Sequence, residues 1–232
     1  MTGRQITAWL TVPDAVVAHY VHPDLRPPVA DAHQSRLRFY EMEANGERFH
    51  ELVTSLPMRA GGVDGEATLV LWSDSENYRT WAREEFGWPA LDARFEYEGS
   101  LWETGPPEGA TGSARARMSE GTIALTVETP ARAAEPVSGW MVRKPWLAPR
   151  RIVHRGGLDG ETREVMDVKP SIRRPGTRLV AQGRARFDLG PGNPYTALGE
   201  VVCEVEVLDG FELVVGDTVE LVCSEHVAAP VR

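Results

Sequence analysis

Lysine is nearly absent from this sequence: of the 25 basic residues only Lys144 and Lys169 are lysines, and all the others are arginines. Covalent chemistry through a side-chain amine is therefore restricted to two positions. Cysteine is equally scarce, with Cys203 and Cys223 alone, so a disulfide framework is excluded. No group of residues has the spacing of a zinc site, and we expect neither a metal nor another cofactor.

Long apolar runs are missing as well. No stretch approaches the roughly 18 consecutive apolar residues of a membrane span, and the opening MTGRQITAWL lacks the pattern of a secretory leader. The formal net charge of −9 argues against binding of nucleic acid, because phosphate contacts need clustered cations. These absences predict a soluble cytoplasmic protein that binds neither nucleic acid nor a membrane.

What the sequence does contain is enough apolar side chain for one large core. The 232 residues are 42% apolar, and we treat 1–232 as a single domain. The 22 glycines and 17 prolines are spread along the whole length, which is typical of many short strands joined by turns. The predicted class is α+β, dominated by antiparallel strands, with an early helix over Pro13–Val21. Strands are predicted over Ile6–Val12, Leu37–Glu43, His50–Met58, Glu66–Trp72, Leu91–Glu98, Thr122–Glu128, Arg150–His154, Arg163–Val168, Arg178–Phe187, Glu200–Leu208, Phe211–Val215 and Thr218–Cys223.

The clearest helix follows the strand that ends at Trp72. Ser73 and Glu76 fit a capping box, in which Ser73 would accept a hydrogen bond from the amide of Glu76. Gly87 suits a left-handed cap at the helix end, and Pro89 prevents continuation. Spacings of three and four place four side chains on one stripe of this helix: Tyr78, Trp81, Ala82 and Glu85.

The run from Trp72 to Leu91, WSDSENYRTWAREEFGWPAL, resembles the core signature of the acetoacetate decarboxylase family. In that signature a Gly-Arg-Glu on a short helix precedes an aromatic-Pro-Lys-Lys. Here Ala82-Arg83-Glu84 stands for the first motif, and Trp88-Pro89 stands for the aromatic-Pro. The resemblance extends weakly along most of the chain, and it implies a closed sheet or barrel around a central cavity, few helices and a homo-oligomer.

The two positions after Pro89 depart from the family pattern. The family's first lysine forms a Schiff base with the substrate carbonyl, and its second lysine lowers the pKa of the first. In this sequence these positions are Ala90 and Leu91, and neither side chain can act as a nucleophile or carry a charge. Ordinary acetoacetate decarboxylation through an amine at this place is therefore excluded.

Carboxylates are the remaining candidates for catalysis. The resemblance places Glu51 at a family carboxylate and Glu41 near a second one, although a slip of one residue would turn Tyr40 inward instead of Glu41. His50 adjoins Glu51, but strand alternation puts their side chains on opposite faces. Each of these carboxylates also fits an ordinary place on a solvated strand edge.

The resemblance implies further side chains for substrate binding. Arg83 would orient a carboxylate or enolate, with Glu84 beside it, and Trp88, Tyr97 and Tyr40 would form cavity walls. Each of these residues also has a purely structural interpretation. Arg83 and Glu84 could form ion pairs on the helix, and Trp88 could be an ordinary core residue.

Three functions remain open from the sequence. The first is a lyase, isomerase or cyclase that works without a Schiff base, by carboxylate acid/base catalysis on a small oxo acid or enol, in a biosynthetic pathway. The second is a pseudoenzyme that binds such a small molecule without catalysis. The third is a decarboxylase whose lysine has moved to Lys144, which lies in an apolar and aromatic setting beside Arg143.

Overall fold

A computed structural model describes residues 1–20, 25, 33–134, 141–142, 147–153, 161–168, 171–173, 177–214 and 219–227. Its two α-helices are α1 (Asp14–Tyr20) and α2 (Glu76–Phe86), and two short 3-10 helices span Ser100–Trp102 and Pro194–Leu198. The strands of the first half are β1 (Thr2–Thr11), β2 (Gln34–Ala44), β3 (Glu47–Ala60), β4 (Val63–Ser73), β5 (Ala90–Asp92), β6 (Arg94–Glu98), β7 (Gly112–Met118) and β8 (Gly121–Val127). Those of the second half are β9 (Arg132–Ala133), β10 (Met141–Val142), β11 (Leu147–Val153), β12 (Glu161–Val168), β13 (Ser171–Arg173), β14 (Thr177–Leu189), β15 (Glu200–Val214) and β16 (Val219–Val227).

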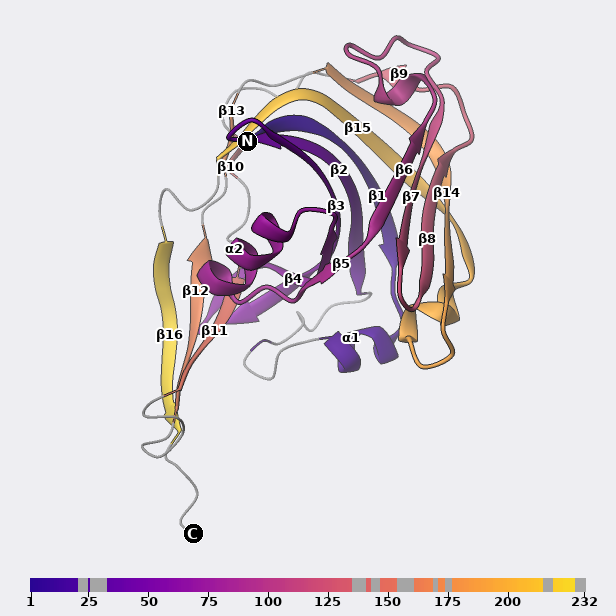
Figure 1. Cartoon of the computed structure of the whole chain (residues 1–232). Coiled ribbons are helices and arrows are strands. Elements are labelled where there is room, and N and C mark those ends of the chain that lie inside the picture. Colours follow the sequence, from indigo (N-terminus) through magenta and orange to yellow (C-terminus); the bar gives the residue numbers. More distant parts are fainter. Residues whose placement is uncertain are drawn as a thin grey trace.

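Thirteen strands form one strongly curved sheet, with the order β5-β4-β3-β2-β1-β15-β14-β8-β7-β6 along its main path. Neighbouring strands on this path are antiparallel except β4 and β5, which are parallel. Its two end strands, β5 and β6, are separated in sequence by Ala93 alone, so the sheet bends into a nearly closed barrel (Figure 1). The predicted class, mostly antiparallel β-structure with few helices, is confirmed.

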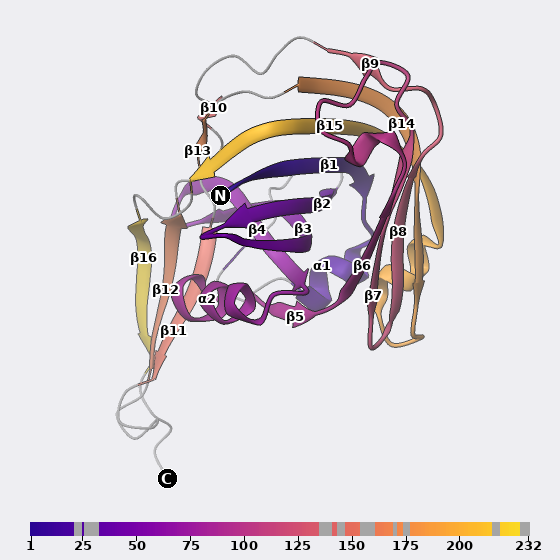
Figure 2. The same cartoon turned by 45° about the horizontal axis from the view of Figure 1, so that its top comes forward.

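A second, three-stranded sheet of β11, β12 and β16 lies beyond α2 (Figure 2). Strand β11 contacts β3, β4 and α2, and α2 also contacts β4 and β5. Helix α2 therefore covers the face of the curved sheet that points away from the barrel interior. Within the described residues, neither helix is long and apolar enough to cross a membrane.

Strand alternation divides the buried side chains between two cores. Phe39, Leu52 and Trp72 point into the barrel and belong to its large apolar cluster. Tyr40 and Val53, one residue further along their strands, belong to the smaller cluster under α2. Since successive side chains of a strand point to opposite faces, β2 and β3 supply both clusters.

A β-bulge in β4 changes which of its side chains face α2. The pairing of β3 with β4 shifts at Thr54, so that Thr68 lies opposite Ser55 and Val70 opposite Thr54, with Leu69 as the extra residue. An extra residue reverses the alternation of the strand that carries it. Thr68 before the bulge and Leu71 after it consequently border the same cavity, described below.

The start of α2 corrects one prediction. The N-cap is Ser75, whose hydroxyl accepts a hydrogen bond from the Tyr78 amide at 3.1 Å. Ser73 is instead fully buried at the end of β4 and donates to the His50 carbonyl at 2.7 Å. The predicted C-cap holds, because Gly87 has φ +66° in the left-handed region that favours glycine.

Other predicted boundaries also differ from the structure. The two strands predicted around Glu200–Leu208 and Phe211–Val215 are one continuous strand, β15. Strands β7 and β9 were not predicted. The strand predicted over Leu91–Glu98 is divided between β5 and β6, at the two ends of the sheet, and Leu91 is 47% exposed.

Candidate functional site

A small buried cavity lies between the curved sheet and α2. The cavity has a volume of about 20 Å³, which is room for one water molecule. Polar and charged side chains line it together with aromatic and aliphatic ones. The lining residues are Arg38, Tyr40, Glu51, Val53, Ser55, Glu66, Thr68, Leu71, Tyr78, Trp88 and Leu213.

Register between β2 and β3 brings the first of these side chains together. Tyr40 is paired with Glu51, and Arg38 with Val53. Directly paired residues point to the same face of a sheet, so all four face α2. The first turn of α2 places Tyr78 against them, because the Ser75 cap fixes where this helix begins.

Glu51 is a buried carboxyl group with few polar partners. This residue is only 6% exposed. Burial raises the pKa of Glu51 to about 8, and this shift is opposed by a hydrogen bond from the Tyr78 hydroxyl and by the charge of Arg38. The group is therefore mostly protonated at neutral pH and changes its charge just above it.

Glu66 is equally buried, yet its surroundings lower its pKa, whereas those of Glu51 raise it. It forms ion pairs with Arg36 and Arg38 and accepts a hydrogen bond from the Ser55 hydroxyl. Burial alone would raise the pKa of Glu66, but the two guanidinium groups and Ser55 together hold it below its usual range. Arg38 also donates to Ser55 at 3.2 Å, so the ion pair is fixed on both sides.

The cavity thus holds two carboxyl groups in different protonation states. Glu51 is neutral and Glu66 is ionised at neutral pH, because only Glu66 has cationic partners in contact. Environments that push two pKa values apart are typical of acid/base sites. Removing one member of a buried ion pair costs about 3–5 kcal/mol because the other charge is left unpaired, so Arg38 and Glu66 depend on each other.

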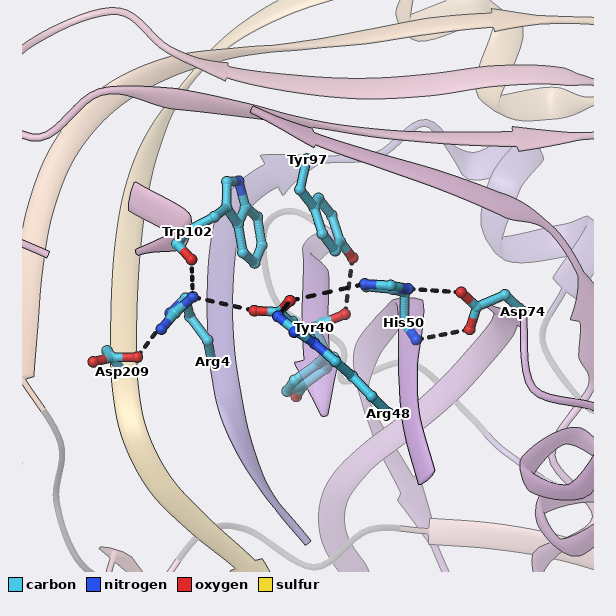
Figure 3. A network of polar contacts seen from close by, with 9 residues as sticks. Arg4, Tyr40, Arg48, His50, Asp74, Tyr97, Trp102 and Asp209 are labelled. Atoms are coloured by element: carbon cyan, nitrogen blue, oxygen red, sulfur yellow. Dashed lines mark hydrogen bonds and ion pairs between the residues drawn. The ribbon is translucent and has the colours of Figure 1, made fainter. Parts of the chain in front are cut away.

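Glu41 lies on the opposite face of the sheet, in a separate polar network with Arg4 and Arg48. Figure 3 labels these two arginines and their neighbours. The Glu41 carboxylate forms ion pairs with Arg4, at 3.1 Å, and with Arg48. Arg4 in turn is bonded to Asp209 at 2.7 Å. The alternative left open by the sequence is settled by this geometry: Tyr40, and not Glu41, faces the cavity.

His50 belongs to the same network, on the face predicted by alternation. Its Nδ1 lies 2.6 Å from an Asp74 carboxylate oxygen, and its backbone amide donates to the other oxygen at 2.7 Å. Tyr97 stands edge-on to the His50 ring with centroids 4.9 Å apart, and its hydroxyl donates to the Tyr40 carbonyl at 2.8 Å (Figure 3). Tyr97, predicted as a cavity wall, therefore lies outside the cavity.

The remaining predicted residues divide in the same way. Trp88 is buried and lines the cavity beside Tyr40 and Glu51. Arg83 and Glu84 are exposed on α2 and do not line it, because the stripe of α2 that faces the sheet is formed by other residues. The Arg83 guanidinium donates to the Ala90 carbonyl at 3.3 Å, so this side chain connects α2 to β5.

The positions that depart from the family signature lie next to the cavity. Ala90 is buried in the same apolar cluster as Tyr40, Leu71 and Trp88, and Leu91 points to the surface. Lys144 and Lys169 lie outside the described residues. Within the described ranges, no group of three or more His, Cys, Asp or Glu side chains is placed to hold a metal ion.

Most of the lining residues were not predicted as site residues, among them Arg38, Glu66 and Tyr78. Arg38 shares its face with Tyr40 by simple alternation, and Tyr78 is on the predicted stripe of α2, so a signal existed for both. No such signal existed for Glu66, because this residue and Leu71 line the same cavity only through the bulge at Leu69.

Comparison with solved structures now defines the class of fold. The chain is similar to the enduracididine biosynthesis enzyme MppR in complex with pyruvate, with a TM-score of 0.66 and 12% identity over 96% of this chain and 89% of that one. It is also similar to acetoacetate decarboxylase from Legionella pneumophila (TM-score 0.60, 14% identity, 92% and 85% covered). An acetoacetate decarboxylase-like enzyme from Sphingomonas wittichii RW1 matches comparably (TM-score 0.60, 17% identity, 93% and 92% covered).

No protein-family model matches the chain, and no curated protein matches it in sequence. The structural likeness nevertheless extends over nearly the whole chain. The fold is that of acetoacetate decarboxylase and acetoacetate decarboxylase-like enzymes, as the Trp72–Leu91 signature implied.

Proposed function

We propose that this protein is an enzyme that transfers protons on a small carbonyl or enol compound, with Glu51 as the acid/base group. The observation that carries the proposal is the Glu51 carboxyl itself, buried at the cavity with its pKa raised to about 8. A group that titrates near neutrality both releases and accepts protons efficiently at physiological pH. The reaction class is that of a lyase, isomerase or cyclase.

The proposed chemistry proceeds without a Schiff base. Ala90 and Leu91 stand where the resembling family has its two lysines, and neither offers an amine. The decarboxylase alternative requires Lys144, which is outside the described residues. Reduction with borohydride in the presence of pyruvate distinguishes the two, since only a protein imine yields a stable mass adduct.

Proton transfer at Glu51 accounts for both directions of an enolisation. In one direction the Glu51 carboxylate takes a proton from the carbon next to the carbonyl, the C–H electron pair becomes the C=C bond, and the carbonyl pair moves onto oxygen. In the other direction the protonated carboxyl returns the proton to carbon. Arg38 brings positive charge to the cavity in which the enolate oxygen would develop its negative charge.

The other lining residues would shape the site. Tyr40 and Trp88 provide aromatic walls, and Tyr78 holds the Glu51 carboxyl by its hydroxyl. Glu41, Tyr97, Arg83 and Glu84 are outside the cavity, so the proposal gives them no contact with substrate.

Hydrogen exchange into a simple oxo acid tests the proposal. Pyruvate, the ligand of MppR in its complex, is incubated with the protein in D₂O, and loss of its methyl protons is followed by NMR against a blank without protein. We expect catalysed exchange that increases with pH up to about 8, because abstraction requires the ionised form of Glu51. Glu51→Gln should lower the rate by about 100-fold or more, and Glu84→Gln on the exposed face of α2 should leave it unchanged.

Exchange by Glu51→Gln at the parental rate would remove the role assigned to Glu51. Binding without exchange would instead support the second candidate, a small-molecule binding protein. That candidate is favoured by the loss of both lysines from positions 90 and 91. Saturable binding of pyruvate by both the parent and Glu51→Gln, with no exchange by either, is its expected signature.

A further inference from the structure

A larger cleft lies immediately outside the small cavity. It measures about 580 Å³, within the roughly 300–1,000 Å³ of small-molecule sites, whereas the inner cavity at about 20 Å³ accommodates only a water. Tyr78 and Leu213 line both spaces. A molecule larger than water that reaches Glu51 must therefore leave most of its atoms in the cleft.

Tyr78 separates the two spaces. Its hydroxyl is bonded to Glu51 on the inner side. Its ring stacks on Phe49 with centroids 4.6 Å apart and an interplanar angle of 28°, and lies 5.6 Å from the Trp81 ring. Rotation of this one side chain would open the way from the cleft to the carboxyl group.

The side chains of the cleft select for a particular chemistry. Tyr78 and Trp81 are half-buried aromatic rings on its wall, with Leu213 as a further apolar surface. On its polar side the Glu47 carboxylate accepts from the Ser75 hydroxyl at 2.6 Å and from the Asn77 amide at 3.3 Å. Among the described residues that line the cleft, Glu47 is the charged side chain, and the terminal ammonium of Met1, which donates to the Leu213 carbonyl at 3.0 Å, is the cation.

We propose that this cleft is the binding site for the non-reacting part of the substrate, a planar aromatic group that carries a positive charge or a hydrogen-bond donor. Aromatic faces attract planar rings and cations, and Glu47 repels an anion at the same place. The carbonyl end would extend past Tyr78 to Glu51. That last step rests on the proposed function, whereas binding of the aromatic group does not.

The test compares two small probes of the same shape and opposite charge, benzamidine and benzoate. Binding is followed by the indole N–H signal of Trp81, which is assigned by its loss in Trp81→Phe. We expect saturable shifts with benzamidine and binding of benzoate at least about tenfold weaker. Glu47→Gln should reduce the preference for benzamidine about fivefold, as expected for one exposed ion pair.

Glu84→Gln is the matched control, because Glu84 is an exposed carboxylate on α2 that does not line the cleft. It should leave the preference unchanged. Equal affinity for the two probes, a Trp81 signal that neither probe moves, or a preference that Glu47→Gln does not alter would each overturn the assignment. The measured quantity is the ratio of the two affinities. A variant that binds both probes more weakly by the same factor therefore leaves this ratio unchanged.

The same probes separate this inference from the proposed function. Glu51 does not line the cleft, so Glu51→Gln should bind benzamidine like the parent. Normal benzamidine binding together with absent pyruvate exchange would contradict the reaction and leave the cleft assignment standing. Glu51-dependent exchange together with no discrimination between the probes would contradict the cleft assignment alone.

Discussion

At the scale of single residues, two carboxyl groups on one sheet face differ in charge because of their immediate contacts. Glu66 has Arg36 and Arg38 as ion-pair partners, and Glu51 has a neutral phenol. A buried carboxylate without a cation in contact is disfavoured, so Glu51 keeps its proton while Glu66 loses its own. The chemical capacity of the cavity therefore depends on the lack of a direct cationic partner for Glu51.

This difference predicts how stability depends on pH. The pKa of Glu51 is about 8 in the folded protein against 4.5 for the ordinary group, so folding is penalised progressively as pH rises from about 4.5 to about 8. The penalty grows by about 1.4 kcal/mol per pH unit and reaches a few kcal/mol in total. Glu51→Gln removes it, and the free energy of unfolding of this variant should increase relative to the parent between pH 5 and pH 8.

Urea unfolding at several pH values measures this change. Glu84→Gln, which removes an exposed carboxylate outside the cavity, is measured beside it as the comparison variant. A difference between Glu51→Gln and the parent that stays constant over the same range would show that Glu51 titrates normally in the folded protein.

At the scale of elements, the beginning of α2 decides whether Tyr78 reaches Glu51. The Ser75 hydroxyl accepts from the Tyr78 amide and donates to Glu47, while Asp74, just before it, holds His50 of β3. The helix is thus attached to β3 through the two residues that precede it. The same contacts fix Tyr78 between the cavity and the cleft.

Substitution of the cap tests this attachment. Ser75→Ala should lower the free energy of unfolding by about 1 kcal/mol and accelerate hydrogen exchange of the Tyr78 amide, because that amide loses its acceptor. Ser73→Ala is the comparison, since Ser73 bonds to His50 and not to this amide. Faster exchange of the Glu76 amide in Ser73→Ala, with no change at Tyr78 in Ser75→Ala, would restore the capping box expected from the sequence.

At the scale of the whole molecule, closure of the curved sheet brings strands very close at Gly183. This residue lies in β14, paired with Val127 of β8 on one side and with Cys203 of β15 on the other. A Cβ atom here would lie 2.6 Å from the Thr126 carbonyl oxygen and 2.7 Å from a methyl group of Val205. Glycine is thus required by close approach of backbone, as is common where sheets bend.

Gly183→Ala should therefore lower the free energy of unfolding by about 2 kcal/mol, the usual range for an overfilled position. Gly192→Ala is the control, because a Cβ there meets nothing within 4 Å. Both changes restrict the unfolded chain alike, so their difference isolates the clash. Equal stability of the two variants in urea would show that β8 and β15 move apart without cost.

The sequence alone determined much of this protein, through strand alternation and through glycine at the end of the helix. The opposite orientations of His50 and Glu51, the common face of Arg38 and Tyr40, and the helix end at Gly87 follow from neighbours in the chain, and the structure has all of them. That positions 90 and 91 are Ala90 and Leu91, which carry no amine, is equally a property of the sequence. These features need only the period of a strand or the geometry of a single turn.

Tertiary structure decided the rest. The bulge at Leu69 brings Glu66 into the cavity, the register of β1 with β2 places Arg4 on Glu41, and the shared position of Tyr78 joins cavity to cleft. The pKa values of Glu51 and Glu66 likewise depend on which groups enclose them. Each of these depends on contacts between segments distant in the chain, whose register and burial local periodicity does not specify.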